Sequence, residues 1–173
     1  MMNIALFGDT GMVGQEIERI LDHHDLVEIG YRQNSKRQEG DLDACALAFL
    51  ATKDPESMTF AVELVKKGKR FIDMSGAFRL TKELFEAWYD MDHTAPDLLE
   101  EAVYGMPAIS AEQIRVANVV GCPGCYPTSV ILSLRPLKDL LQGEATVVST
   151  SGISGARRDR KSTRLNSSHQ IIS

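Results

Sequence analysis

Short apolar runs alternate with segments of helical periodicity along most of the chain. The apolar runs are typical of buried strands and occupy residues 3–7, 26–31, 44–51, 70–74 and 115–120. Apolar residues recur at helical spacing in residues 12–23, 55–67, 82–90 and 128–134. Strands that alternate with helices predict a parallel sheet covered on both faces, and therefore an α/β fold with a doubly wound sheet of Rossmann type.

Local signals mark where the central helices begin and end. Gly68 follows the second helix and is expected to end it, and Thr81 can cap the third. Three side chains are expected to anchor the third helix to the core: Leu84, Trp88 and Tyr89. His93 falls in the polar connection that follows and is expected to be solvated, so it receives no role. Residues 110–113 have the form of a capping box and predict one short helical turn.

A glycine-rich loop joins the first strand to the first helix. It reads Gly8-Asp9-Thr10-Gly11-Met12-Val13-Gly14, a G-x-x-G-x-x-G spacing rather than the commoner G-x-G-x-x-G. Glycines allow a tight turn and close backbone approach, and a helix N-terminus favours a pyrophosphate. We therefore predict dinucleotide binding, the alternative being a turn that binds nothing. The predicted binding residues are Gly8, Thr10, Gly11, Met12, Val13 and Gly14.

The end of the second strand indicates which dinucleotide would bind. Sites selective for NAD place a carboxylate there to hold the ribose hydroxyls. In this chain, residues 32–37 are basic and polar and include no carboxylate. A 2′-phosphate suits Arg32, Ser35 and Lys36, so the predicted cofactor is NADP(H). A solvated basic loop is the alternative.

A cysteine turn lies between the last apolar run and the last helix. It reads Gly121-Cys122-Pro123-Gly124-Cys125-Tyr126-Pro127-Thr128. Pro127 suits the first position of a helix, which places Cys125 at a helix N-terminus. Unpaired backbone N–H groups and the helix dipole favour thiolate there, so we predict that Cys125 is a nucleophile. The alternative is a small buried apolar side chain, the interpretation that we give to Cys45.

Several of these segments resemble the semialdehyde dehydrogenase family, and most closely its members that reduce N-acetylated acyl phosphates. The resemblance lies in residues 73–79, 103–107, 123–128 and 151–156. The family's nucleophilic cysteine follows the glycine of the cysteine turn, which implies the same role for Cys125. Cys122 stands where the family usually has asparagine, and Ala77 stands where it has aspartate.

The resemblance also implies the rest of the site. A Ser- and Arg-bearing loop at a strand end is where a parallel sheet gathers ligand, so Ser75, Arg79 and Gly124 are the expected substrate contacts. Arg79 would hold the substrate phosphate in a bidentate fork, the alternative being a surface ion pair. Tyr104 and Gly105 are expected to pack beneath the cysteine turn.

The implied activity is that of an NADP-dependent oxidoreductase. It would reduce N-acetyl-L-glutamyl 5-phosphate to the semialdehyde through a thioester on Cys125, a step of arginine biosynthesis. The longer aminoadipyl phosphate of lysine biosynthesis is a second candidate substrate, because one methylene changes binding by only ~1–3 kcal/mol. The residues are also compatible with a C-x-x-C redox module or with a dinucleotide-binding module that has no chemistry of its own.

The resemblance covers residues 2–156 and suggests a division of the chain. Residues 1–143 would form the NADP-binding Rossmann domain, and residues 144–156 the first strand of a truncated α+β catalytic domain. Residues 157–173 are polar and basic without periodicity, and we expect a disordered, non-native tail. The family's general-base histidine lies further on, so the chain alone is expected to be inactive.

Composition narrows the classes of partner. The net charge of −5 argues against nucleic acid, and no apolar run is long enough to span a membrane. Three cysteines are too few for a disulfide framework, and the N-terminus lacks a secretory signal. We expect a cytoplasmic homo-oligomer that acts on a small acyl phosphate and holds no metal.

Overall fold

The computed structural model describes residues 1–150 and 171–172. The chain forms two compact units, Met1–Gly124 and Cys125–Ser173. The division falls inside the cysteine turn, whereas the expected domain boundary follows residue 143. Cys122 therefore belongs to the first unit, and Cys125 is the first residue of the second.

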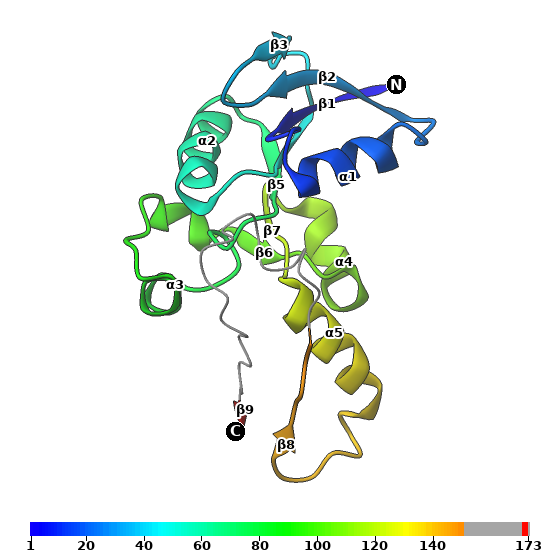
Figure 1. Cartoon of the computed structure of the whole chain (residues 1–173), viewed down its shortest axis with the longest axis vertical. Coiled ribbons are helices and arrows are strands. Elements are labelled where there is room, and N and C mark those ends of the chain that lie inside the picture. Colours follow the sequence, from blue (N-terminus) through cyan, green and yellow to red (C-terminus); the bar gives the residue numbers. More distant parts are fainter. Residues whose placement is uncertain (151–170, 173) are drawn as a thin grey trace. The chain divides into compact units, whose positions relative to one another are not determined.

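The first unit is built on a seven-stranded sheet in the order β3-β2-β1-β4-β5-β7-β6 (Figure 1). Its strands are β1 (Met2–Phe7), β2 (Val27–Gln33), β3 (Gln38–Gly40), β4 (Leu47–Leu50), β5 (Arg70–Asp73), β6 (Ala102–Tyr104) and β7 (Val119–Gly121). Every pairing is parallel except that of β2 with β3. The predicted Rossmann-type sheet is confirmed, while β3 and β6 were not predicted.

The strand order reverses between β1 and β4. From β1 the chain builds outward to β2 and β3, then returns to place β4 on the other side of β1. The backbone N–H of Ala51, after β4, donates to the carbonyl of Phe7 at the end of β1 (2.9 Å). Such switch points are where doubly wound sheets bind ligands, and Gly8 follows Phe7 directly.

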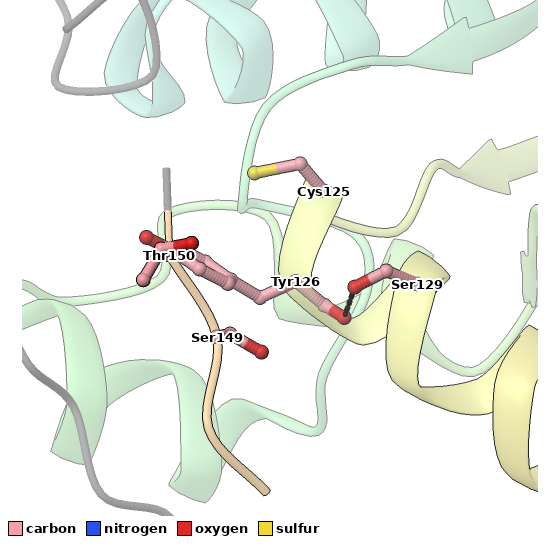
Figure 2. Close-up of a pocket in the computed structure, with 5 residues that line it drawn as sticks. All are labelled: Cys125, Tyr126, Ser129, Ser149 and Thr150. Carbon is pink, nitrogen blue, oxygen red and sulfur yellow. Dashed lines mark hydrogen bonds between the residues drawn. The ribbon is translucent and has the colours of Figure 1, made fainter. Parts of the chain in front are cut away.

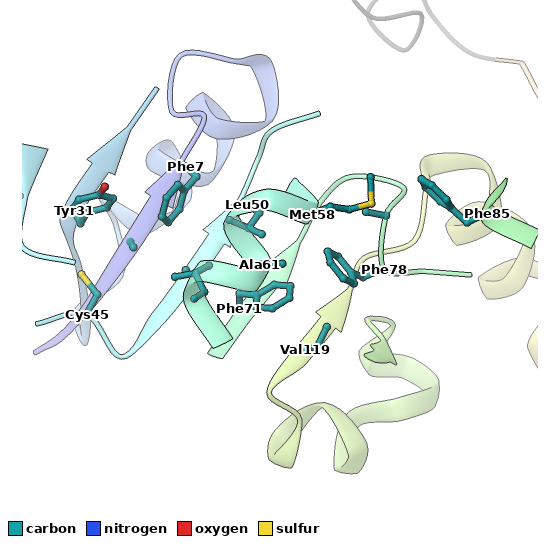
Figure 3. Close-up of a cluster of buried hydrophobic side chains, with 14 residues drawn as sticks. Phe7, Tyr31, Cys45, Leu50, Met58, Ala61, Phe71, Phe78, Phe85 and Val119 are labelled. Atoms are coloured by element: carbon teal, nitrogen blue, oxygen red, sulfur yellow. The ribbon is translucent and has the colours of Figure 1, made fainter. Parts of the chain in front are cut away.

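Helices cover both faces of this sheet, because successive residues of a strand point to opposite sides. On one face Ala5 and Phe7 of β1 join a core with α2 (Asp54–Lys66), and on the other Ile4 and Leu6 pack with Ile17 of α1 (Met12–Leu21) (Figure 1). Figure 3 shows the larger core, which the following labelled side chains share: Phe7, Tyr31, Cys45, Leu50, Met58, Ala61, Phe71, Phe78, Phe85 and Val119. The predicted core role of Cys45 is confirmed.

Helix α3 (Lys82–Tyr89) begins as predicted but buries a different face. The Thr81 hydroxyl accepts a hydrogen bond from the backbone N–H of Leu84 (3.4 Å), which confirms the cap. The predicted anchors Leu84 and Trp88 are wrong, because their side chains are 47% and 70% exposed. Phe85 is the buried residue, and the partly buried Tyr89 stacks on it with 4.7 Å between ring centroids.

Helix α4 (Pro107–Val116) replaces the single turn predicted around residue 110. It follows the 3₁₀ turn η1 (Pro96–Leu99) and β6, and it has a kink at Ser110. The Ser110 hydroxyl contacts the carbonyls of Tyr104 (2.6 Å) and Met106 (2.9 Å). Because α4 runs through Val116, the strand predicted over residues 115–120 shortens to β7.

The second unit contains α5 (Cys125–Leu134), the 3₁₀ turn η2 (Arg135–Leu137) and a two-stranded sheet. The sheet pairs β8 (Ala145–Thr146) with β9 (Ile171–Ile172) in antiparallel fashion. The strand expected after residue 144 thus does lie in a different sheet. The loop expected at 151–156 and the tail at 157–170 and 173 lie outside the described residues. None of the described helices is long and apolar enough to cross a membrane.

Candidate functional site

The glycine loop is folded tightly against the switch point of the sheet. Gly8 has a φ of +83°, and a Cβ there would lie 2.5 Å from the carbonyl oxygen of Ala51. A Cβ on Gly14 would lie 2.2 Å from the carbonyl oxygen of Gly8. Both positions therefore require glycine, the first for its backbone conformation and the second for close packing of α1 on the loop.

The N-terminus of α1 is suited to an anion. Gly11 is the N-cap residue, so no side chain caps the helix, and the first turn contains no acidic residue. A Cβ on Gly11 would meet its nearest atom at 3.4 Å, so this glycine is not enforced by packing. Thr10, Met12 and Val13 are exposed at the same end. The residues present therefore fit the pyrophosphate of a dinucleotide.

Asp9 ties the glycine loop to the turn that follows β2. Its buried carboxylate accepts hydrogen bonds from the Asn34 amide (2.8 Å) and the Arg37 guanidinium (2.5 Å). Burial acts to raise the pKa of Asp9, but the bonds from Arg37 and Asn34 outweigh it and hold the pKa below its ordinary value. No role was predicted for Asp9, because nothing local in the sequence indicates a partner so far along the chain.

The three residues predicted for a 2′-phosphate differ in what they contact. Arg32 is half-buried and donates to Glu18 of α1 through Nη2 (2.8 Å) and Nε (3.0 Å). Ser35 and Lys36 are exposed on the turn after β2. The Asn34 side chain shapes this turn by accepting the backbone N–H of Lys36 (2.8 Å). Arg32 is thus engaged within the protein, whereas Ser35 and Lys36 face solvent.

Ser75, expected to contact substrate, is only 2% exposed. Its hydroxyl donates to Oδ2 of Asp73 (2.7 Å) and accepts the backbone N–H of Ala77 (3.1 Å). Burial raises the pKa of the fully buried Asp73 despite these neighbours. Ser75 therefore shapes the loop after β5, and the substrate contact expected of it stays a prediction.

Arg79 folds back on the same loop. Its Nη2 donates to the carbonyls of Met74 (3.3 Å) and Ser75. Its Nε is buried and has no hydrogen-bond partner among the described residues. Arg79 forms no surface ion pair with a described residue, so the ion-pair interpretation loses support, and the guanidinium stays within a loop at the carboxyl end of the sheet.

Cys122 lies in the first unit against this loop. Its backbone N–H donates to the carbonyl of Asp73 (2.8 Å). Burial, together with the Asp73 charge, raises the pKa of the Cys122 thiol to about 11, against the opposing influence of Arg79. Gly105 lies beneath, because a Cβ there would be 3.3 Å from the Cα of Cys122. The expected packing of Gly105 under the cysteine turn is confirmed.

Cys125 is exposed and is the first residue of α5. The helix begins earlier than the predicted position after Pro127, so the thiol stands at its very start. The thiol borders a cavity of about 370 Å³, lined by Cys125, Tyr126, Ser129, Ser149 and Thr150 (Figure 2). The Ser129 hydroxyl donates to the carbonyl of Tyr126 (2.9 Å). Within residues 1–150, no acid–histidine–cysteine cluster capable of holding a metal is present.

Comparison with known sequences identifies relatives of this chain. Residues 32–117 match the family model described as semialdehyde dehydrogenase, NAD binding domain. The N-acetyl-gamma-glutamyl-phosphate reductase of Thermus thermophilus is 38% identical over 92% of this chain and 52% of its own length. The reductase of the same name from Heliobacterium modesticaldum is 35% identical over 92% and 53%. The chain spans about half the length of the curated relatives it matches.

Solved structures agree on the fold. Aspartate semialdehyde dehydrogenase from Candida albicans, solved with NADP, has a TM-score of 0.62 at 15% identity and covers 90% of this chain and 53% of its own. Aspartate semialdehyde dehydrogenase II from Vibrio cholerae has a TM-score of 0.56 at 20% identity, over 80% and 47%. Sequence and fold agree: residues 32–117 match the NAD-binding domain of semialdehyde dehydrogenases, and the chain shares the fold of solved aspartate semialdehyde dehydrogenases.

Proposed function

We propose that this chain supplies the cofactor-binding part and the nucleophile of an NADPH-dependent reductase. The substrate would be N-acetyl-L-glutamyl 5-phosphate, reduced to its semialdehyde in arginine biosynthesis. Relatives at 34–38% identity carry the name of that activity. The observation that carries the proposal is the exposed thiol of Cys125 at the first residue of a helix, reached by the short turn of residues 122–124 after β7.

Cys125 would act by covalent catalysis. Its thiolate attacks the carbonyl carbon of the acyl phosphate, and the C–O bond to phosphate breaks. Inorganic phosphate departs, and the acyl group remains bound to Sγ as a thioester. NADPH supplies the hydride that reduces this thioester. Collapse of the resulting hemithioacetal releases the semialdehyde and returns the thiolate. Backbone N–H groups at the start of α5, including the one that follows Gly124, would stabilise the oxyanion.

Residues of the first unit would bind and orient the ligands. The backbone of Gly8–Gly14 would hold the pyrophosphate at the N-terminus of α1, and Ser35 and Lys36 the 2′-phosphate. Arg32 would contribute charge from its place beside Glu18. Arg79 would take the substrate phosphate, its Nε being a buried donor without a described partner.

Two competing functions have less support. A C-x-x-C redox module needs two reactive thiols, and the raised pKa of Cys122, about 11, disfavours its thiolate. The aminoadipyl substrate differs by one methylene and stays open to test. A homo-oligomeric state and a cytoplasmic location stay predictions.

A chimera tests the proposal directly. Residues 1–150 would be joined to the second half of the Thermus thermophilus relative and assayed for phosphate-dependent oxidation of N-acetylglutamate semialdehyde with NADP⁺. We expect activity that requires inorganic phosphate and is greater than with the aminoadipate homologue. A folded chimera that binds NADP(H) yet oxidises neither semialdehyde would overturn the proposed reaction.

A further inference from the structure

His93 is a buried titratable side chain that the proposed chemistry does not use. It was expected to be solvated, but it is only 4% exposed in the connection between α3 and η1. A buried imidazole is stable only when its nitrogens find suitable partners. The partners of His93 therefore indicate both its protonation state and what it holds in place.

Both ring nitrogens of His93 contact the backbone. Nε2 lies 2.8 Å from the carbonyl oxygen of Ala77, and Nδ1 lies 3.3 Å from the backbone nitrogen of Ala95. A carbonyl can only accept and a backbone N–H can only donate, so Nε2 carries the proton and Nδ1 is bare. Phe78 and Phe85 close the pocket, each nearly perpendicular to the imidazole ring. The geometry therefore fits one neutral tautomer.

The bond to Ala77 fastens the loop that carries Arg79, residues 75–80. This loop is held from α2 as well, because Asp54 accepts the backbone N–H of Gly76 (2.5 Å). It also lies directly on β7, since a Cβ on Gly121 would be 2.0 Å from the carbonyl oxygen of Phe78. Displacement of the Ala77 carbonyl would therefore shift the backbone from which Arg79 projects.

The charged groups around His93 come from α3 and α2. On α3, Glu86 accepts the backbone N–H of His93 (3.1 Å) and also pairs with Lys82 (2.7 Å). On α2, Asp54 bonds the loop, while Met58 offers a neutral sulfur to Thr94 (3.3 Å). Burial lowers the pKa of His93, and the Ala77 carbonyl and Glu86 oppose that effect without reversing it.

We propose that neutral His93 is a positioning residue that latches the loop of residues 75–80, and with it Arg79, and that a proton on Nδ1 releases the latch. A protonated Nδ1 would face the Ala95 N–H, donor against donor, and the charged ring would be buried between Phe78 and Phe85. Burial of that charge outweighs the bond to Ala77, so the imidazolium would move out toward water and its bond to Ala77 would break. Because the pKa of the folded state is lowered, the latch is intact above the ordinary value of about 6.5 and is lost as the pH falls through the lowered value. The latch itself is independent of the proposed function. Only the consequence that a fixed Arg79 would bind the substrate phosphate better rests on that proposal.

Nitrogen-15 NMR of the full 173-residue chain tests the tautomer without any ligand. At pH 7.5 we expect the His93 ring to show a protonated Nε2 and a bare Nδ1. It should titrate below the ordinary histidine value of about 6.5. A ring protonated on Nδ1 at pH 7.5, neutral or charged, would overturn the assignment.

Hydrogen exchange then tests the latch, with amides of residues 75–80 followed from pH 7.5 to 4.5 and corrected for intrinsic rates. We expect exchange in the wild type to accelerate roughly tenfold on acidification, the size expected for loss of one buried hydrogen bond. His93→Gln keeps a neutral donor, so its loop should stay protected across the range. His93→Phe fills the aromatic pocket without the bond and should exchange fast at every pH.

Two comparisons keep the test decisive. His24→Gln, at an exposed histidine, should exchange like the wild type. Modification of Arg79 by phenylglyoxal, read by mass spectrometry, should speed up in His93→Phe at pH 7.5 but not in His93→Gln. Equal loop exchange in the wild type and both His93 variants at all pH values would refute the latch, whether or not the chimera reduces acyl phosphates.

Discussion

After β1 the chain enters α1 through glycines, whereas after β7 it enters α5 through two cysteines, a proline and a glycine. Both turns leave the carboxyl end of a parallel strand of one sheet. The first offers only backbone N–H groups at an uncapped helix end, and a Cβ added at Gly8 or Gly14 would lie 2.5 or 2.2 Å from a carbonyl oxygen. The second ends in an exposed thiol. On the proposed function, the same kind of strand-to-helix junction would serve noncovalent binding where glycines leave only backbone groups, and covalent chemistry where a cysteine begins the helix.

Within the second turn, the two cysteines show how strongly position decides reactivity. Cys122 is half-buried beside Asp73, with its pKa raised to about 11. Cys125, three residues later, is exposed at the first residue of α5. The variants below test both contrasts, between the two turns and between the two thiols.

The largest expected effect comes from the nucleophile. In the chimera, Cys125→Ala should lower semialdehyde oxidation by at least roughly 10³-fold, because no other group can form the thioester. Cys122→Asn should keep most of the activity, since it restores the residue that the family usually has. The assay is phosphate-dependent NADPH formation. Two equally inactive variants would instead favour a paired-thiol mechanism.

Alkylation compares the thiols in the chain itself. With iodoacetamide at pH 7.5, Cys125 should react roughly a hundredfold faster than Cys122, because thiolate is the reactive form and Cys122 is partly shielded. Cys45 should be slower than Cys125 as well, since burial raises its pKa. Peptide mass spectrometry over time gives all three rates. A faster Cys122 would contradict the structural contrast.

In the first turn, two glycines should respond differently to alanine. Gly14→Ala should cost about 3 kcal/mol of unfolding free energy, because its Cβ would overlap the Gly8 carbonyl. Gly11→Ala should cost less than about 1 kcal/mol and chiefly weaken NADPH binding. Urea denaturation and fluorescence titration separate the two effects. Similar stabilities for both variants would show that the loop does not pack as described.

Cofactor choice should change by a smaller amount. The wild-type chain is expected to bind NADPH more tightly than NADH. Lys36→Glu should reduce NADPH affinity about tenfold and leave NADH affinity nearly unchanged, because only the former has a 2′-phosphate. Lys66→Glu, an exposed lysine on α2, is the matched control. Calorimetric titration measures the affinity for both NADPH and NADH. If Lys36→Glu lowered both affinities equally, a contact between Lys36 and the 2′-phosphate would be contradicted.

The smallest effect is expected where Asp9 meets Arg37. Arg37→Gln should lower the Tm by a few degrees at pH 7, the guanidinium being 43% exposed and partly screened. The pKa of Asp9 is lowered by folding, so its stabilisation is present above the ordinary value of 3.8 and is lost as the pH falls through the lowered value. Melting curves of wild type and variant should therefore converge in acid. A constant gap would point to lost packing instead.

The sequence predicted best where the signal was local. The glycine loop and the capped start of α3 follow from neighbouring residues, and so does the helix N-terminus at Cys125. The prediction of the buried face of α3 was wrong: Leu84 and Trp88 have helical spacing, yet the helix buries the adjacent stripe through Phe85. Strand β3 carries no apolar residue, so no periodicity marked it.

The site contacts that the sequence missed all join distant residues. Asp9 of the glycine loop meets Arg37 in the turn between β2 and β3, and His93 meets Ala77 across α3. A polar side chain looks the same in sequence whether it faces water or a carbonyl from elsewhere in the fold. Ser75 shows that a motif position can also have a structural part, because its hydroxyl bonds Asp73 and the loop backbone.

The two outer strands of the sheet also bear on how the protein avoids self-association. An unpaired strand edge is a template for pairing with another chain, and short, charged edges discourage it. Strand β3 is three residues long, exposed throughout, and carries Glu39 beside Arg37, while β6 at the other border is equally short. Without β3, the seven-residue β2 would become the border. Removing residues 38–40 should therefore promote edge-to-edge aggregation even if the nucleotide loop stays intact.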